Sequence, residues 1–151
     1  MHFKDINNRI QNINIMPKLL DMYKKKSLKY DNYQDIEEQR LVIDTIISLE
    51  KDNQKKRDFL IKVITLNPSK EIKRSAINTF SWSFNDDEAI NFLINLLNNP
   101  ESMIRREVVS RFSYLYNPSS ESKEKIHKSL LIMLKNENDI AVRYEIIGTL
   151  G

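Results

Sequence analysis

Apolar residues recur every three or four positions along most of the chain, which is the spacing of one face of an α-helix. From residue 35 to residue 50, for example, the apolar positions include Ile36, Val42, Ile43, Ile46, Ile47 and Leu49. No stretch alternates apolar and polar residues for long enough to predict a β-strand. The pattern therefore predicts an all-α protein.

Proline, asparagine, serine and aspartate mark where the helices begin and end. Pro17 suits the first position of a helix, where its missing N–H costs nothing. Asp35 and Ser69 suit the N-caps of later helices, because their side-chain oxygens can accept a bond from a free backbone N–H. Residues before proline avoid the α region, so the Asn-Pro steps at 67–68, 99–100 and 117–118 separate helices. The predicted helix pairs span about 17–50, 53–83, 86–116 and 119–150, after a short helix within the first sixteen residues.

An internal repeat runs through the second helix of each predicted pair. Three segments align without gaps: IKRSAINTF from Ile72, IRREVVSRF from Ile104 and VRYEIIGTL from Val142. A weaker fourth copy, EQRLVIDTI from Glu38, keeps the later apolar positions. Positions 1, 5, 6 and 9 of each segment are apolar and lie on one stripe of a helix, whereas position 2 is basic. Each copy is therefore expected to bury the same face.

These segments resemble the second helix of a HEAT-like repeat, in which a short turn precedes Val-Arg, two residues, a small apolar pair and Leu. The resemblance covers roughly residues 17–151, and it implies an α-solenoid of about four helix pairs in one domain over residues 1–151. The small alanine of the family is present only as Ala76, with Val108 and Ile146 in the other copies, so the helix pairs are expected slightly further apart. TPR and ankyrin repeats have similar periods, but their signatures are absent.

The composition removes several classes of function. The 151 residues include two glycines and no cysteine, which excludes glycine-rich phosphate loops, disulfides and cysteine nucleophiles. The two histidines, His2 and His127, are far apart in sequence, and the HExxH, GxSxG and Walker motifs are absent. We therefore expect no enzymatic activity, no metal site and no cofactor.

Charge and hydropathy bear on location and on nucleic acid. The first sixteen residues lack the apolar core of a signal peptide, and no apolar run reaches the ~18 residues of a membrane helix. The absence of cysteine suits a reducing compartment, so we expect a cytoplasmic protein without membrane contacts. The net charge is +3, from 24 basic and 21 acidic residues, so counterion release would contribute little and nucleic-acid binding is expected to be weak.

Positions 3, 7 and 11 of the repeat point away from the buried stripe. Stacked second helices line the concave surface of a HEAT solenoid, so the resemblance implies that these positions form one patch. The candidate partner-binding residues are Arg40, Arg74, Asn78, Trp82, Arg106, Ser110, Tyr114 and Tyr144. Arginine, tryptophan and tyrosine are enriched in binding hot spots. Alternatively, Trp82 and Tyr114 lie near helix ends and fold under the loops between repeats.

The other basic residues have a structural interpretation. In the resembled family, the base at position 2 commonly pairs with an acid in a turn of the same or a neighbouring repeat, with direct ligand binding as the alternative. Here the bases are Lys73, Arg105 and Arg143, and Glu71, Glu101 and Asp139 are the acids expected to supply their partners. The tracts Lys24–Lys26 and Lys55–Arg57 fall on first helices, which form the convex surface, and we interpret them as solvated.

These features favour a non-enzymatic protein-binding module that is a monomer when free and uses the concave face of a short solenoid. A compact solenoid without enzyme motifs resembles the immunity proteins of bacterial polymorphic-toxin systems, such as contact-dependent inhibition, and this implies a secreted toxin domain as the cognate partner. Three alternatives stay open. They are a nucleic-acid binder similar to the HEAT-like DNA glycosylases, a general adaptor or scaffold, and a chaperone of the phycobilin-lyase type, for which no residue marks a chromophore site.

Overall fold

The computed structural model describes residues 15–26 and 32–151, and every regular element in these ranges is an α-helix. The prediction of an all-α chain is therefore confirmed for the described residues. The chain divides into two compact units, Met1–Lys56 and Arg57–Gly151. The additional helix expected near the N-terminus lies outside the described residues.

The first unit contains α2 (Met16–Lys26) and α3 (Tyr33–Leu49), which pack against each other. The buried side-chain amide of Gln39 on α3 donates a hydrogen bond to the backbone carbonyl of Tyr23 on α2, at 3.1 Å. This bond satisfies a carbonyl close to the C-terminal end of α2, where helical carbonyls lack partners within the helix.

The prediction that Asp35 caps α3 is wrong. The cap is Asn32, whose side-chain oxygen accepts a hydrogen bond from the Asp35 N–H at 3.0 Å while its own backbone is extended. Asp35 lies in the first turn instead, where its negative charge is favourable at the positive end of the helix dipole. Asparagine and aspartate are equally good caps, so residue type alone does not choose between these two positions.

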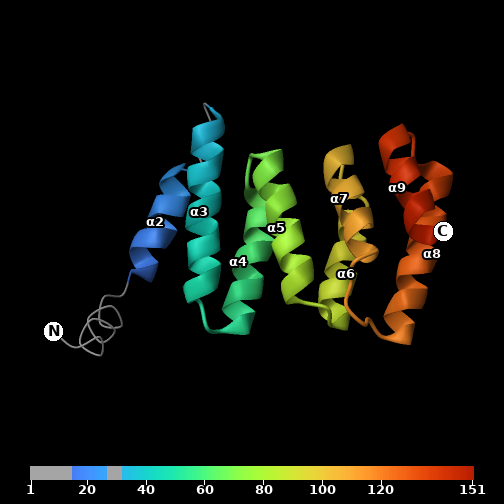
Figure 1. Cartoon of the computed structure of the whole chain (residues 1–151), viewed down its shortest axis with the longest axis horizontal. Helices are drawn as coiled ribbons and strands as arrows, with labels where there is room; N and C mark the ends of the chain where they lie inside the picture. The colour runs from blue at the N-terminus through green and yellow to red at the C-terminus, as the bar shows by residue number, and fades with distance from the viewer. Residues whose placement is uncertain (1–14, 27–31) are drawn as a thin grey trace. The chain divides into compact units, whose positions relative to one another are not determined.

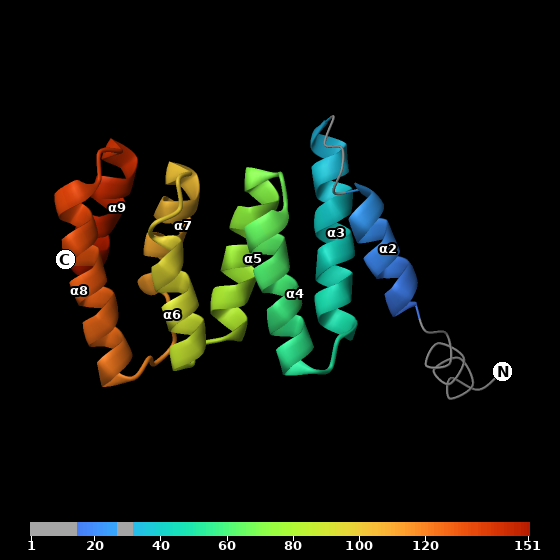
Figure 2. The ribbon, with the colours of Figure 1, turned by 180° about the vertical axis from the view of Figure 1, so that it is seen from behind.

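The second unit holds most of α4 (Asn53–Leu66) and five further helices. These are α5 (Lys70–Ser83), α6 (Asp87–Leu96), α7 (Ser102–Phe112), α8 (Ser120–Asn136) and α9 (Ile140–Leu150). Helix α7 packs between α5 and α9, and these three form one layer (Figure 1). Helices α6 and α8 pack against each other and form a second layer behind it, which faces the viewer in Figure 2.

The repeat positions build the core of the second unit. In α5 and α7, positions 1, 5, 6 and 9 are all buried, as the apolar stripe predicts. Between the layers, the ring of Phe80 lies 5.1 Å from that of Phe92 on α6. Position 6 differs in α9: Ile147 is 53% exposed, whereas Ile77 and Val109 are buried by the helix that follows. Helix α9 packs against α7 and α8 and leaves that position uncovered.

The turns that precede α5, α7 and α9 share one construction. The residue two positions before each N-cap accepts a hydrogen bond from the backbone N–H of the N-cap, at 2.9 Å in all three turns; these residues are Asn67, Asn99 and Glu137. The predicted cap Ser69 is confirmed, because its hydroxyl accepts a bond from the Ile72 N–H. The same local structure therefore starts each helix of the front layer.

Helix α7 ends at Phe112, four residues before the predicted end. The N–H groups of Ser113 and Tyr114 bond to carbonyls three residues back, which tightens the chain into a turn. Asn117 then adopts a left-handed conformation with φ of 46°, directly before Pro118. The residue before proline avoids the right-handed α region, so Pro118 accounts for a break at Asn117 but not for the earlier end of α7 at Phe112. The second helices of the other three pairs, α3, α5 and α9, end within one residue of the predicted ends of those pairs.

Among the described residues, no helix combines the length and apolar character needed to cross a membrane.

Candidate functional site

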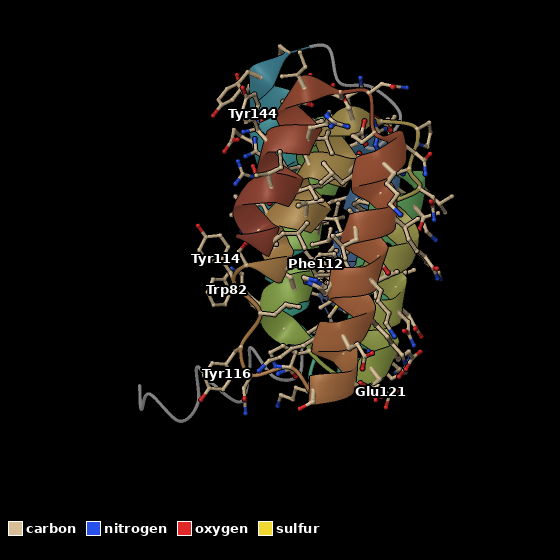
Figure 3. The ribbon with its side chains drawn as sticks, turned by 90° about the vertical axis from the view of Figure 1, so that its right-hand side faces the viewer. Trp82, Phe112, Tyr114, Tyr116, Glu121 and Tyr144 are labelled. Carbon is tan, nitrogen blue, oxygen red and sulfur yellow. The ribbon has the colours of Figure 1, made fainter. Side chains whose placement is uncertain are left out.

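Three aromatic side chains project from the front layer of the second unit. Trp82 on α5, Tyr114 after α7 and Tyr144 on α9 are 66%, 61% and 73% exposed. Figure 3 shows them on one side of the unit, opposite Glu121 of α8, whereas Phe112 points between the layers. The alternative that Trp82 and Tyr114 fold under the loops is therefore wrong. We define the arginine–aromatic face as Arg74, Trp82, Arg106, Arg111, Tyr114 and Tyr144.

Two arginines of this face form a ladder of ion pairs across the layer. The Nε of Arg74 on α5 lies 2.7 Å from a carboxylate oxygen of Glu107 on α7, and the Nε of Arg106 on α7 lies 3.3 Å from one of Glu145 on α9. More than half of each arginine side chain is exposed, whereas Glu107 is buried and Glu145 is largely covered. The carboxylates therefore lie beneath the guanidinium groups and hold them from below.

Arg111 connects this ladder to the aromatic rings. It lies 3.2 Å from the second carboxylate oxygen of Glu107 and donates a hydrogen bond to the side-chain oxygen of Asn78 at 2.7 Å. The indole N–H of Trp82 donates to the same Asn78 oxygen at 3.0 Å. The guanidinium of Arg111 also lies over the ring of Tyr114, at 5.1 Å from its centre, which is within cation–π range. Trp82 and Tyr114 are thus exposed and yet held in orientation.

A hollow of about 260 Å³ opens between the rungs of the ladder. Its lining residues are Arg74, Met103, Arg106, Glu107, Ser110, Arg111 and Glu145. A wider depression of about 540 Å³ lies beside it on α9, lined by Arg106, Ile140, Ala141, Tyr144, Glu145 and Gly148. The hollow holds three guanidinium groups and two carboxylates, and the depression is mostly uncharged.

The structure gathers most of the predicted site residues. Ser110 lines the hollow with Arg74 and Arg106, and Asn78 links Arg111 to Trp82. The members on one side of the second unit are Arg74, Asn78, Trp82, Arg106, Ser110, Tyr114 and Tyr144. Arg40 belongs to the first unit, where it pairs with Glu37 of the same helix at 3.0 Å. That these residues bind a partner remains a prediction.

Sequence reasoning missed Arg111 of the face and the two covered glutamates that pair with its arginines, Glu107 and Glu145. Glu107 and Glu145 both occupy position 4 of their repeat segments, where the first segment has Ser75. Each of these acids follows, one repeat later, an arginine at position 3. That staggered Arg-to-Glu pattern is a readable signal, and it indicates ion pairs between successive helices.

The bases at position 2 have structural roles, as expected, but only one of them has an expected partner. Lys73 pairs with Glu101 of the next turn at 3.0 Å, which confirms that pair. Arg105 binds Glu137 instead of Glu101 or Asp139, through two N–O contacts of 2.8 Å. The pair is largely covered, and the guanidinium lowers the pKa of the Glu137 carboxyl. Arg143 donates to the backbone carbonyl of Leu134 in the last turn of α8 and to that of Glu137 in the turn before α9. These three basic side chains therefore join helices to neighbouring turns.

The interpretation of Lys55–Arg57 as a solvated tract is wrong for Arg57. Its side chain is only 12% exposed, and its guanidinium lies 4.7 Å from the centre of the Phe84 ring. It also pairs with Asp86, the N-cap of α6, and the hydrogen bond between them lowers the pKa of that carboxyl. The residue therefore links the start of α4 to the end of α5 and the start of α6. The contacts with Phe84 and Asp86 therefore bury most of the Arg57 side chain.

The described residues contain no group of three or more histidine, aspartate or glutamate side chains that could hold a metal ion. No protein-family model matches the chain, and no curated protein is significantly similar to it. The arginine–aromatic face is therefore the feature from which function is inferred.

Proposed function

We propose that this protein is a non-enzymatic protein-binding module, built as a short α-solenoid of HEAT-like helix pairs. Its partner is a cognate protein that docks on the arginine–aromatic face. The observation that carries the proposal is that Trp82 and Tyr114 are exposed while Asn78 and Arg111 hold their orientation. Because the Trp82 indole is exposed, it contributes little to the free energy of folding, and its fixed orientation suits a binding surface.

The physical advantage of such a face is pre-organisation. Side chains that are already ordered lose little conformational entropy when a partner covers them. Tryptophan and tyrosine also bury a large area and keep a polar group at the rim of the contact. On α9 the exposed Ile140 and Ile147 extend the apolar surface beyond Tyr144. The face therefore combines arginine and aromatic residues, which are the common hot-spot residues, with neighbouring apolar side chains.

The solenoid part of the proposal is supported by the repeated local geometry. Helices α5, α7 and α9 begin after the same kind of turn and bury the same positions 1 and 5. The ladder also uses the same positions at both interfaces, from position 3 of one helix to position 4 of the next. In a linear repeat array, each repeat contacts the repeats before and after it in the same way.

The role we propose within this class is that of a bacterial immunity protein, which neutralises a toxin by covering its active site or a nearby surface. The chain has no recognisable catalytic motif, and the exposed aromatic residues Trp82, Tyr114 and Tyr144 of the second unit lie on one side of it. One face is sufficient for a partner that is bound and blocked, whereas an adaptor joins two proteins and needs a second binding surface. General adaptor function is the alternative if no toxin is found.

The test is a calorimetric titration with the protein encoded beside this chain in its genome. The double variant Arg106→Ala with Trp82→Ala should weaken the complex about a hundredfold or more, since each side chain is a typical hot spot. A matched control, Lys62→Ala with Tyr33→Ala, removes an exposed base and an exposed aromatic ring that are not part of the face. Changing Lys24, Lys25 and Lys26 to alanine should alter mainly the association rate and its salt dependence.

Two results would contradict the proposal at different levels. Loss of binding in the control but not in the double variant would show that the partner uses another surface. Failure of the expressed protein to protect cells from a toxin that it binds would remove the immunity role and leave the binding module. Circular dichroism should show the same helix content in all variants, because none of the replaced side chains is buried.

A further inference from the structure

We infer that the hollow between Arg74 and Arg106 is a carboxylate-binding site that receives an acidic side chain of the protein partner. This inference rests on the proposed function and specifies the chemistry of the partner. The hollow lies inside the arginine–aromatic face and is lined by three arginines. A guanidinium presents its N–H donors in a planar fork that matches a carboxylate.

Arg74 and Arg106 still have hydrogen-bond donors available for a ligand, although each already pairs with a glutamate. Arg74 and Arg106 each contact their glutamate through Nε, and their side chains are 61% and 56% exposed. The terminal nitrogens of both groups therefore remain accessible to a ligand. The ion pairs beneath fix the position of each guanidinium, so binding a carboxylate requires little further ordering. Ser110 adds a hydroxyl donor to the lining.

The local charge favours an anion. Three guanidinium groups and two carboxylates line the hollow, which leaves one positive charge in excess. Glu107 is shared between Arg74 and Arg111 and is buried, so it is shielded from an incoming acid. A carboxylate that enters thus meets the exposed guanidinium groups first and contacts the covered acids least.

The same arrangement disfavours nucleic acid. A phosphate backbone carries a closely spaced row of charges and is bound by several cations in series. Here Arg74 and Arg106 are already paired with carboxylates, and the lining of the hollow carries a net charge of only +1. Met103 in the lining and the nearby rings of Trp82 and Tyr114 instead suit a short peptide segment in which apolar residues flank the acid.

The direct test is a nuclear magnetic resonance titration of the arginine Nε–H signals of the whole protein. Sodium acetate is the probe, with sodium chloride at the same ionic strength as the reference. The Arg74 and Arg106 signals should shift and saturate with acetate, whereas Arg57 and Arg143, which bind groups of the protein itself, should not. Equal responses of Arg74 and Arg106 to acetate and chloride would overturn the inference.

A second measurement identifies the source of the anion. A labelled short peptide that alternates leucine with glutamate should bind about threefold or more tightly than the same peptide with glutamine, by fluorescence anisotropy. Arg106→Gln should remove that difference, and Arg106→Lys should restore only part of it, because lysine lacks the fork. The matched control Lys62→Gln, with the same charge change at an exposed position on α4, should keep it.

The remaining outcomes separate this inference from the proposed function. If oligothymidylate binds more tightly than the glutamate peptide and loses affinity in Arg106→Gln, the face binds nucleic acid and the inference is overturned. If acetate leaves the arginines unaffected while Trp82→Ala still abolishes binding of the cognate protein, the carboxylate site fails and the proposed function stands. If acetate binds as expected but no protein partner does, the proposed function fails and the carboxylate-binding site alone stands.

Discussion

Replacing Glu137 by glutamine should lower the free energy of unfolding of the second unit by about 2–3 kcal/mol at neutral pH. Glu137 is 8% exposed and accepts two hydrogen bonds of 2.8 Å from Arg105 and one of 2.9 Å from the Asp139 N–H. Glutamine keeps one oxygen acceptor of the same size but removes the charge. Arg105 would then be a largely covered cation without its counter-ion.

The magnitude follows from what Arg105 retains. Breaking a fully buried ion pair by removing one partner costs about 3–5 kcal/mol. Arg105 is still 17% exposed, and it also donates to the backbone carbonyls of Asn99 and Pro100. Water and these two carbonyls compensate part of the loss, which places the expected cost below that range.

The same pair predicts a dependence on pH. Arg105 lowers the pKa of Glu137 from its ordinary value of 4.5, so the folded state holds this carboxyl ionised at a lower pH than the unfolded state does. The resulting stabilisation is fully present above pH 4.5 and is lost as the pH falls through the folded-state pKa. The stability difference between the natural protein and Glu137→Gln should therefore shrink as the pH falls below 4.5.

Urea denaturation followed by tryptophan fluorescence would measure this effect, because Trp82 is the single tryptophan of the chain and lies in the second unit. The matched control is Glu124→Gln, which removes an exposed ion pair with Lys128 on α8 and should leave the urea midpoint at neutral pH nearly unchanged. Equal midpoints for Glu137→Gln and the natural protein would refute the assignment of Arg105–Glu137 as a stabilising link. A difference that stays constant down to pH 3 would refute the pKa argument.

Substitutions at three further positions test the fold. Phe80→Ala should cost about 3–5 kcal/mol in urea denaturation, since Phe80 is fully buried between the layers, and a cost near 1 kcal/mol would contradict that packing. Trp82→Ala should change the stability by less than about 0.5 kcal/mol by thermal melting followed by circular dichroism, because the side chain is mostly exposed. Asn117→Ala should cost about 1 kcal/mol and Asn117→Gly close to nothing in the same melting assay, because φ is 46° there; equal effects would exclude the left-handed conformation.

Much of the local structure could be predicted from residue order. Ser69 caps α5 as expected, and the Asn-Pro steps separate helices, because capping and the restriction before proline involve only a few neighbouring residues. The buried positions of the repeat were also predicted, since a period of 3.6 residues places them on one stripe. The exposure of Trp82 and Tyr144 follows from the same periodicity, on the opposite side of the helix.

The partners of charged side chains could not be predicted in the same way. From the sequence, Arg105 could pair with Glu101, Glu137 or Asp139. Only the packing of α7 against the turn before α9 selects Glu137. Arg57 belongs to a lysine-rich tract, and its burial depends on Phe84 and Asp86, about thirty residues away. A long side chain can reach several neighbours, so its partner depends on how helices are placed in three dimensions.

The sequence by itself determined which residues form helices, where most of those helices start, and which side of each helix is buried, because these properties depend on neighbours within a few positions. Only the tertiary structure decided that Glu107 and Glu145 hold Arg74 and Arg106 from below, and that Arg111 links Glu107 to Asn78 and Tyr114. The contacts of Glu107 with Arg74, of Glu145 with Arg106 and of Arg111 with Asn78 join residues 33 to 39 positions apart, and their distances are set by the packing of one helix on the next. Helical periodicity describes each helix alone and therefore does not contain that information.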